Sequence, residues 1–216
     1  MSYSNNTMRA KSKSSAATTT TKSSAATNPD SLLDRALRLG NTLGEVMMNR
    51  DGKISATILA VSGEQIFGVW GDLESEIAKD NFLRVARMMG IAYGADALVT
   101  IVEAWTDIPS KLIESAPLLT AQSLEPNECV SILAQTMGET RHDRLMIRRD
   151  WNGRFLCLDR CLIPNDAPVF GPFSQIMYGR VPNEAERKNA MNLLKEMGME
   201  AVLLPFPLSI AAQNPN

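Results

Sequence analysis

The sequence predicts an α+β fold, in which a mostly antiparallel sheet packs against two or three helices in a single domain behind a disordered N-terminal tail. Apolar residues recur at helical spacing near residues 31–47, 73–94 and 184–197. Short β-branched runs lie between these segments, and the Asn-Gly pair at 152–153 joins two of them as a hairpin, which makes neighbouring strands antiparallel. A chain of 216 residues that is 44% apolar can bury a core without a metal or a disulfide.

The first helix is predicted to begin after residues 28–31 (Asn-Pro-Asp-Ser), which end in a residue that can cap a helix. Its apolar positions are Leu32, Leu33, Ala36, Leu37 and Leu39. Gly40 or Gly44 can end this helix, because glycine adopts the left-handed conformation that often follows a last turn. Alternatively, the helix continues through residues 46–47. The Asp-Gly pair within residues 50–53 then predicts a turn.

The next segments predict a hairpin, a helix and a buried strand. Two apolar runs at residues 54–61 and 65–70 are separated by Ser-Gly-Glu, as in a hairpin. The period then becomes helical from Leu73 to about Gly94. Residues 97–105 (Ala-Leu-Val-Thr-Ile-Val-Glu-Ala-Trp) are the clearest strand. This strand is apolar on both faces, so we expect it at the centre of the sheet with cover on each face.

A meander follows a proline-interrupted connection at 107–127. Three strands are predicted at residues 129–137, 144–149 and 154–162, and the last two flank the Asn-Gly turn. This part of the sheet is therefore expected to be antiparallel.

The C-terminal region predicts one helix and a short strand. The helix runs from residue 184 to 197, with Asn183 as its cap and Gly198 closing it. Its buried stripe is predicted to be Ala190, Met191, Leu194 and Met197. Residues 201–204 predict a last strand, which the following prolines end.

Composition divides the chain into three segments. Residues 1–29 form a low-complexity Ser/Thr/Ala/Asn tail with too little apolar surface to become ordered. Residues 30–210 are predicted to form the single α+β domain, and residues 211–216 a frayed C-terminus. The tail carries four basic residues and no acid, so a net charge of −2 for the chain leaves −6 on the remainder. Such a tail is a soluble linker or an electrostatic arm.

Charge and apolar patterning exclude several classes of protein. A net charge of −2 provides no global basic field for nucleic acid or anionic lipid. No apolar run reaches the length that a membrane helix needs. The tail lacks the apolar core of a secretory signal, and although its Ser/Thr/Ala content is typical of an organellar transit peptide, Arg9 is its only arginine. Three cysteines are too few for a disulfide scaffold, so we expect a cytoplasmic protein with no membrane contact.

The motifs that carry common enzyme chemistry are missing. Neither a Gly-rich phosphate loop nor a nucleophile elbow occurs, and we predict no cofactor. His142 is the only histidine and is expected in a solvent-facing turn between two strands. Cys157 and Cys161 would stand roughly 13 Å apart along a strand, which is too far for one zinc ion or one disulfide. We therefore predict no metal site and expect the cysteines to be small buried hydrophobes.

Glu103 is the candidate for acid-base chemistry. It lies late in the most apolar predicted strand, close to Trp105, where a low-polarity environment can raise the pKa of a carboxyl group. The alternative is a glutamate at the edge of the core that pairs with an arginine.

The basic hairpin over residues 141–160 is the candidate binding surface. Its predicted partner-binding residues are Arg141, Arg144, Arg148, Arg149, Trp151 and Arg154. Arginine and tryptophan are typical of protein interfaces, and the same mixture grips single-stranded nucleic acid through phosphate contacts and base stacking. A solvated strand face is the third interpretation.

Residues 95–105, the connection at 123–126 and the following meander are similar to those of small uncharacterised bacterial and phage α+β proteins. The similarity covers about residues 75–162, and its most distinctive word is Val-Glu-Ala-Trp at 102–105. The resemblance implies an α+β sandwich of bacterial or viral origin and implies no activity.

Together these patterns favour a non-enzymatic interaction or accessory protein, of phage or mobile-element origin, that contacts its partner through the 141–160 hairpin. The expected partner is another protein or a second copy of the chain rather than nucleic acid. An enzyme centred on Glu103 and a single-stranded nucleic-acid binder are the alternatives.

Overall fold

The computed structural model describes residues 31–71, 73–106, 127–161, 176–177 and 179–205. In chain order the elements are α1 (Leu32–Asp51), β1 (Ala56–Ser62), β2 (Gln65–Gly71), α2 (Glu76–Ala92), β3 (Ala97–Thr106), β4 (Asn127–Gln135), β5 (Thr140–Arg149), β6 (Phe155–Arg160), α3 (Glu184–Glu196) and β7 (Val202–Leu204). The predicted tail and the predicted frayed C-terminus lie outside the described residues.

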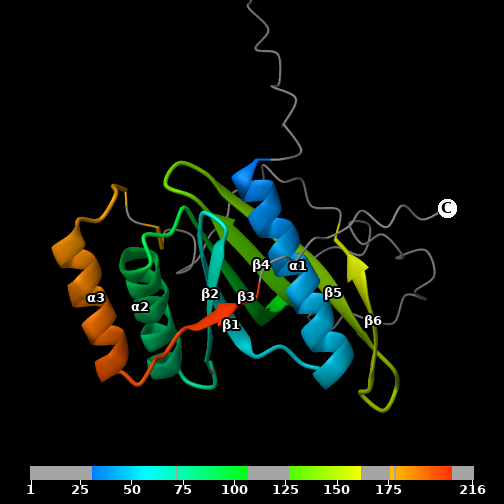
Figure 1. The fold of residues 1–216 in the computed structure, drawn as a ribbon. Helices are drawn as coiled ribbons and strands as arrows, with labels where there is room; N and C mark the ends of the chain where they lie inside the picture. Colours follow the sequence, from blue (N-terminus) through cyan, green and yellow to red (C-terminus); the bar gives the residue numbers. More distant parts are fainter. Residues whose placement is uncertain (1–30, 72, 107–126, 162–175, 178, 206–216) are drawn as a thin grey trace, which may run out of the picture.

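The strands of the described residues form one seven-stranded sheet (Figure 1). Their order is β6-β5-β4-β3-β1-β2-β7, and every neighbouring pair is antiparallel. The order departs from the sequence at two places. Strand β3 pairs with β1 because α2 carries the chain back from β2 across the sheet, and β7 pairs with β2 at the edge. The predicted α+β class with a mostly antiparallel sheet is confirmed.

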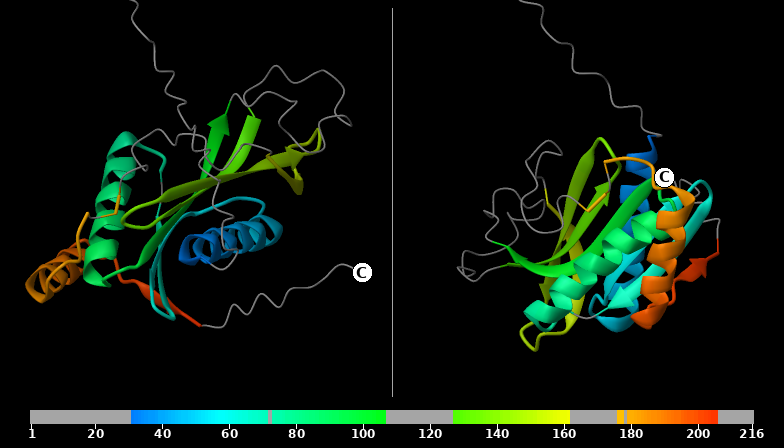
Figure 2. Two further views of the ribbon diagram at one scale, coloured as in Figure 1. Left: turned by 90° about the horizontal axis from the view of Figure 1, so that it is seen from above. Right: turned by 90° about the vertical axis from the view of Figure 1, so that its left-hand side faces the viewer.

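The helices cover both faces of the sheet (Figure 2). Helix α1 packs against one face, where its apolar side chains form a core cluster with residues of β1, β3, β4 and β5. Helix α2 covers the opposite face of β1 and β3, and α3 packs on the outer side of α2. The two faces of the sheet are called below the α1 side and the α2 side.

Helix α1 ends at Asp51, so the third of the three predicted ends is correct. Ser31 caps its start by accepting the Asp34 amide at 3.1 Å. Gly40 and Gly44 lie inside the helix and are both buried against the sheet, where they let the helix axis approach the strands. Gly52, at φ +67°, closes the helix, so the Asp-Gly pair predicted as a turn ends α1 instead.

Strand β3 lies at the centre of the sheet, as its sequence predicts. Its alternate residues enter the two cores: Val99 and Ile101 pack on the α1 side, whereas Leu98 and Val102 pack on the α2 side. Neighbours on both edges complete its hydrogen bonding, with β1 on one side and β4 on the other.

Strand β5 begins at Thr140, four residues earlier than predicted. Arg141 and His142 therefore lie in the strand and not in the preceding turn. The predicted Asn-Gly hairpin between β5 and β6 is present, with Gly153 at φ +77°. Asp150 stabilises this turn, because its Oδ1 accepts the backbone N–H groups of Asn152 and Arg154, each at 2.9 Å. A bulge between Arg148 and Arg149 shifts the register near the tip.

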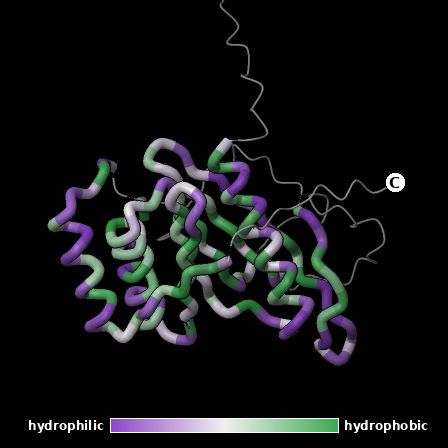
Figure 3. Tube along the Cα trace, in the orientation of Figure 1, coloured by the Kyte–Doolittle hydropathy of each residue, from purple (hydrophilic) through white to green (hydrophobic). Residues whose placement is uncertain are grey.

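Helix α3 begins at a capping box, in which Asn183 and Glu186 exchange side-chain and backbone hydrogen bonds. Ala190 and Leu194 of its predicted stripe are buried, and Met191 and Met197 pack partly buried against the same core. In Figure 3, hydrophilic and hydrophobic residues alternate along α3. The same figure shows hydrophilic residues at the turn between β5 and β6. Of the described helices, none is long and apolar enough to span a bilayer.

Candidate functional site

The arginines of the predicted binding hairpin are divided between the two faces of the sheet. Successive side chains of a strand point to opposite faces. Arg141 and Arg149 therefore share the α1 side with buried Leu145 and Ile147, while Arg144 and Arg148 share the opposite side. The structure does not bring the six predicted residues together into one patch.

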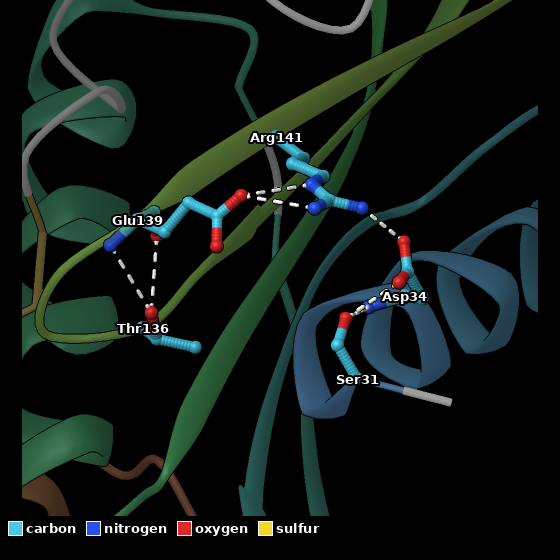
Figure 4. A network of polar contacts seen from close by, with 5 residues as sticks. All are labelled: Ser31, Asp34, Thr136, Glu139 and Arg141. Carbon is cyan, nitrogen blue, oxygen red and sulfur yellow. Dashed lines mark hydrogen bonds and ion pairs between the residues drawn. The ribbon is translucent and has the colours of Figure 1, made fainter. Parts of the chain in front are cut away.

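Arg141 joins β5 to the first turn of α1 (Figure 4). Its guanidinium forms ion pairs with Asp34 and, at 3.0 Å, with Glu139. Only 11% of the Arg141 side chain is exposed. Thr136 holds the turn before β5 by accepting the Glu139 amide at 3.2 Å. Arg141 is thus an internal crosslink between a helix and the sheet.

Two further arginines of the hairpin are engaged within the fold. Arg149 pairs with Glu128 of β4 at 2.7 Å and donates to the Gly52 carbonyl at the end of α1 at 3.1 Å. The hydrogen bond to Glu128 raises the pKa of the Arg149 guanidinium. On the opposite face Arg148 pairs with Asp159 at 3.2 Å, and both side chains are largely buried. These contacts tie β5 to α1, β4 and β6.

Arg144 lies beside a serine-histidine pair on the α2 side. Ser131 Oγ and His142 Nε2 are 2.7 Å apart, across the β4–β5 pairing. Burial lowers the pKa of His142 to about 4, and the positive charge of Arg144 contributes to this. The expectation of a solvent-facing turn is wrong for His142, which is a half-buried strand residue.

The Ser131–His142 pair consists of the two groups that hydrolases use as nucleophile and base. A base acts best when its pKa lies near the working pH. An imidazole with a pKa of about 4 is neutral but weakly basic at pH 7. At that pH the pair is a neutral hydrogen bond between β4 and β5. Sequence reasoning missed it because nothing local indicates that residues 131 and 142 face each other.

The side chain of Glu103 holds the chain just before β1. Its Oε1 accepts the Ile54 N–H at 2.7 Å, and its charge adds to the environment that raises the pKa of Arg149. Trp105, two residues on, has 70% of its surface exposed. This arrangement fits the alternative of a glutamate at the edge of the core near an arginine. Acid-base chemistry at Glu103 stays a prediction.

The tip of the hairpin carries the most exposed apolar side chains of this region. Trp151 is 93% exposed in the turn, and Leu156 at the bulge of β6 is 62% exposed. Arg154 lies between them in the sequence and is also exposed. Strand β6 is the last strand on this side of the described sheet. The term "hairpin tip" is used below for Trp151, Arg154 and Leu156.

Within the part of the chain that the structure describes, the cysteines do not come together with other ligands as a metal site. None of the three is in a disulfide. Cys129 and Cys161 are buried, as predicted, whereas Cys157 is exposed, so the expectation of a buried hydrophobe is wrong for Cys157. Burial raises the pKa of the Cys129 thiol to about 11. The described ranges contain no group of three or more acidic, cysteine or histidine side chains that could hold a metal ion.

Comparisons of the chain with protein-family models, with curated proteins and with solved structures gave no match.

Proposed function

We propose that this chain is a protein-interaction or accessory protein that binds a partner protein through the hairpin tip. The observation that carries the proposal is the 93% exposure of Trp151 in the turn of a hairpin whose strands are tied to the fold next to that turn by the ion pairs of Arg148 and Arg149. A tryptophan that is exposed in the free protein offers a large apolar area for burial by a partner. Tryptophan and arginine are also the residue types that most often dominate binding energy.

The proposed surface is smaller than the one predicted from the sequence. Arg141, Arg148 and Arg149 are excluded because their guanidinium groups pair within the fold. Their contribution is to hold the hairpin in one orientation, which reduces the entropy lost when a partner binds the tip. Arg154 remains as the charged member, flanked by Trp151 and Leu156.

The test compares the partner affinity of three single variants of the full-length chain. The partner is first captured with the wild-type protein from the cells that encode it and is then purified. Its dissociation constant is measured for wild type, Trp151→Ala and Leu156→Ala. Ile77→Ala is the matched control, because Ile77 is 74% exposed on α2, away from the hairpin.

We expect Trp151→Ala to weaken binding about 30-fold, as is typical of a residue at the centre of an interface. Leu156→Ala should weaken binding less, and Ile77→Ala should bind like wild type. All three should melt within a few degrees of wild type because the altered side chains are exposed. Equal affinities for Trp151→Ala and Ile77→Ala would refute the proposal. Capture of nucleic acid with a steep salt dependence would instead favour the nucleic-acid alternative.

A further inference from the structure

A polar cavity of about 420 Å³ lies between α1 and the outer strands β5 and β6. Its volume falls within the range of small-molecule sites. One wall is lined by four residues of α1: Arg38, Asn41, Thr42 and Glu45. Their spacing of three and four residues places them on one stripe of the helix. This stripe lies at the border between the helix face that packs on the sheet and the solvent, since residues 41 and 42 are half-buried while residues 38 and 45 are exposed.

The opposite wall combines apolar and charged side chains. Leu145 of β5 and Leu158 of β6 provide apolar surface, while Asp143 and Arg160 come from the same two strands. Arg160 pairs with Leu145 in the sheet register, so it is the diagonal neighbour of Asp143 on the α1 side. Across the cavity, Glu45 of α1 supplies a second carboxylate.

Asp143 is a half-buried carboxylate held by neutral donors. Its Oδ2 accepts Asn41 Nδ2 at 2.9 Å, and its Oδ1 accepts the Arg144 backbone N–H at 2.9 Å. Among the described residues, no cationic side chain forms an ion pair with Asp143 or Glu45, and no acidic one pairs with Arg160. A partly buried carboxylate is normally compensated by a cation.

The side chain of Asn41 has one buried polar atom without a hydrogen-bond partner among the described residues. Because its Nδ2 donates to Asp143, its Oδ1 is fixed as an acceptor, and that atom is buried without a hydrogen-bond partner among the described residues. Buried polar atoms are rarely left unpaired, and each such case needs an explanation. Here the unpaired oxygen belongs to the residue that holds Asp143, and both residues line the cavity.

We propose that this cavity binds a small zwitterion of the α-amino acid class. The ammonium group lies at Asp143 and Glu45, the carboxylate lies at Arg160, and an apolar side chain packs on Leu145 and Leu158. The opposite charges of Asp143 and Arg160 on neighbouring strands match the two charges that an amino acid carries on one carbon. This site is separate from the hairpin tip and does not depend on the proposed function.

The test uses L-leucine and two truncated analogues as probes. Isoamylamine lacks the carboxylate and 4-methylpentanoate lacks the ammonium group, while both keep the branched side chain. Binding to the full-length protein is measured by titration calorimetry, with thermal melting of each variant as the control for folding. The variants are Asp143→Asn, Glu45→Gln and Arg160→Gln. Arg154→Gln is the matched control, because Arg154 is an exposed arginine of the same hairpin that does not line the cavity.

L-leucine should bind saturably, and each analogue should bind at least about 10-fold more weakly, since each loses one charge-assisted contact. Arg160→Gln should weaken L-leucine binding but leave isoamylamine unchanged. Asp143→Asn should weaken L-leucine but leave 4-methylpentanoate unchanged. Because Glu45 and Arg160 are exposed, these two variants keep the test valid if Asp143→Asn fails to fold. Absence of L-leucine binding, analogues that bind as well as L-leucine, or equal loss in Arg154→Gln would overturn the proposal.

Discussion

Two glycines one turn apart in α1 predict opposite effects of the same substitution. A Cβ at Gly40 would lie 2.5 Å from Ile132 Cγ2 and 2.8 Å from Val99 Cγ1. Both distances are shorter than side chains tolerate, and both neighbours are fully buried β-branched residues of the central strands. A Cβ at Gly44 would lie 3.4 Å from Val130 Cγ1, which is ordinary contact.

The expected magnitudes follow from two opposing effects. Replacing glycine by alanine inside a helix stabilises the fold by up to about 1 kcal/mol. Overpacking a core destabilises it by about 1–3 kcal/mol. Gly44→Ala should therefore stabilise the protein by up to about 1 kcal/mol. With the full helix gain subtracted, Gly40→Ala should destabilise it by up to about 2 kcal/mol, because α1 must move away from β3 and β4.

The assay is equilibrium unfolding in urea, followed by circular dichroism, on the full-length chain and both variants. A change of 1 kcal/mol corresponds to a melting shift of about 2–4 °C at this size, so thermal melting gives a second measurement. The reasoning requires that Gly44→Ala be the more stable variant. If Gly40→Ala were as stable as Gly44→Ala, the close approach of α1 to the sheet would be refuted.

Two further predictions concern the polar contacts of β5. Asp34→Asn should reduce the free energy of unfolding by about 2 kcal/mol. This is less than the loss typical of fully buried pairs, because Glu139 still pairs with Arg141. Urea unfolding measures the change, and an unchanged free energy of unfolding would contradict the prediction. Burial lowers the pKa of His142 to about 4, so between pH 6.5 and 4 the unfolded chain binds a proton at this residue while the folded chain does not. The contribution of His142 to the free energy of unfolding is therefore complete above pH 6.5. It falls by up to about 3 kcal/mol as the pH drops from 6.5 to 4. His142→Asn should remove this part of the pH dependence. The measurement is the change in unfolding free energy between pH 7 and pH 4.5, for the variant and for wild type. An equal change in both proteins would show that His142 is not responsible.

Features that depend on local chemistry could be predicted from the sequence. The Asn-Gly turn, the capping residue Asn183 and the doubly apolar strand at residues 97–105 were each identified correctly, because their conformations depend on residues that are close in the chain. The glycines of α1 could not be assigned in the same way. Glycine both ends helices and permits close packing, and only the position of Ile132 and Val99 opposite Gly40 distinguishes these roles.

The candidate site was harder to predict because residues that carry charge close together in the sequence do not all lie on one surface of the fold. The arginines at positions 141, 144, 148 and 149 are close in the chain, yet the alternation of β5 sends two of them to each face of the sheet. Each of Arg141, Arg148 and Arg149 then meets a carboxylate from another element: Asp34 of α1, Asp159 of β6 and Glu128 of β4.

Those carboxylates are distant in the sequence, so a count of charges within residues 141–160 misses all of them except Asp159. The same alternation places Asp143 and Arg160 on the α1 side, where they line a cavity together with a polar, partly exposed stripe of α1. A hairpin of this kind is therefore better divided by face before its charges are summed. Divided in this way, it contains a structural set of ion pairs, an exposed tip and one wall of a cavity, and each of these makes a separate prediction.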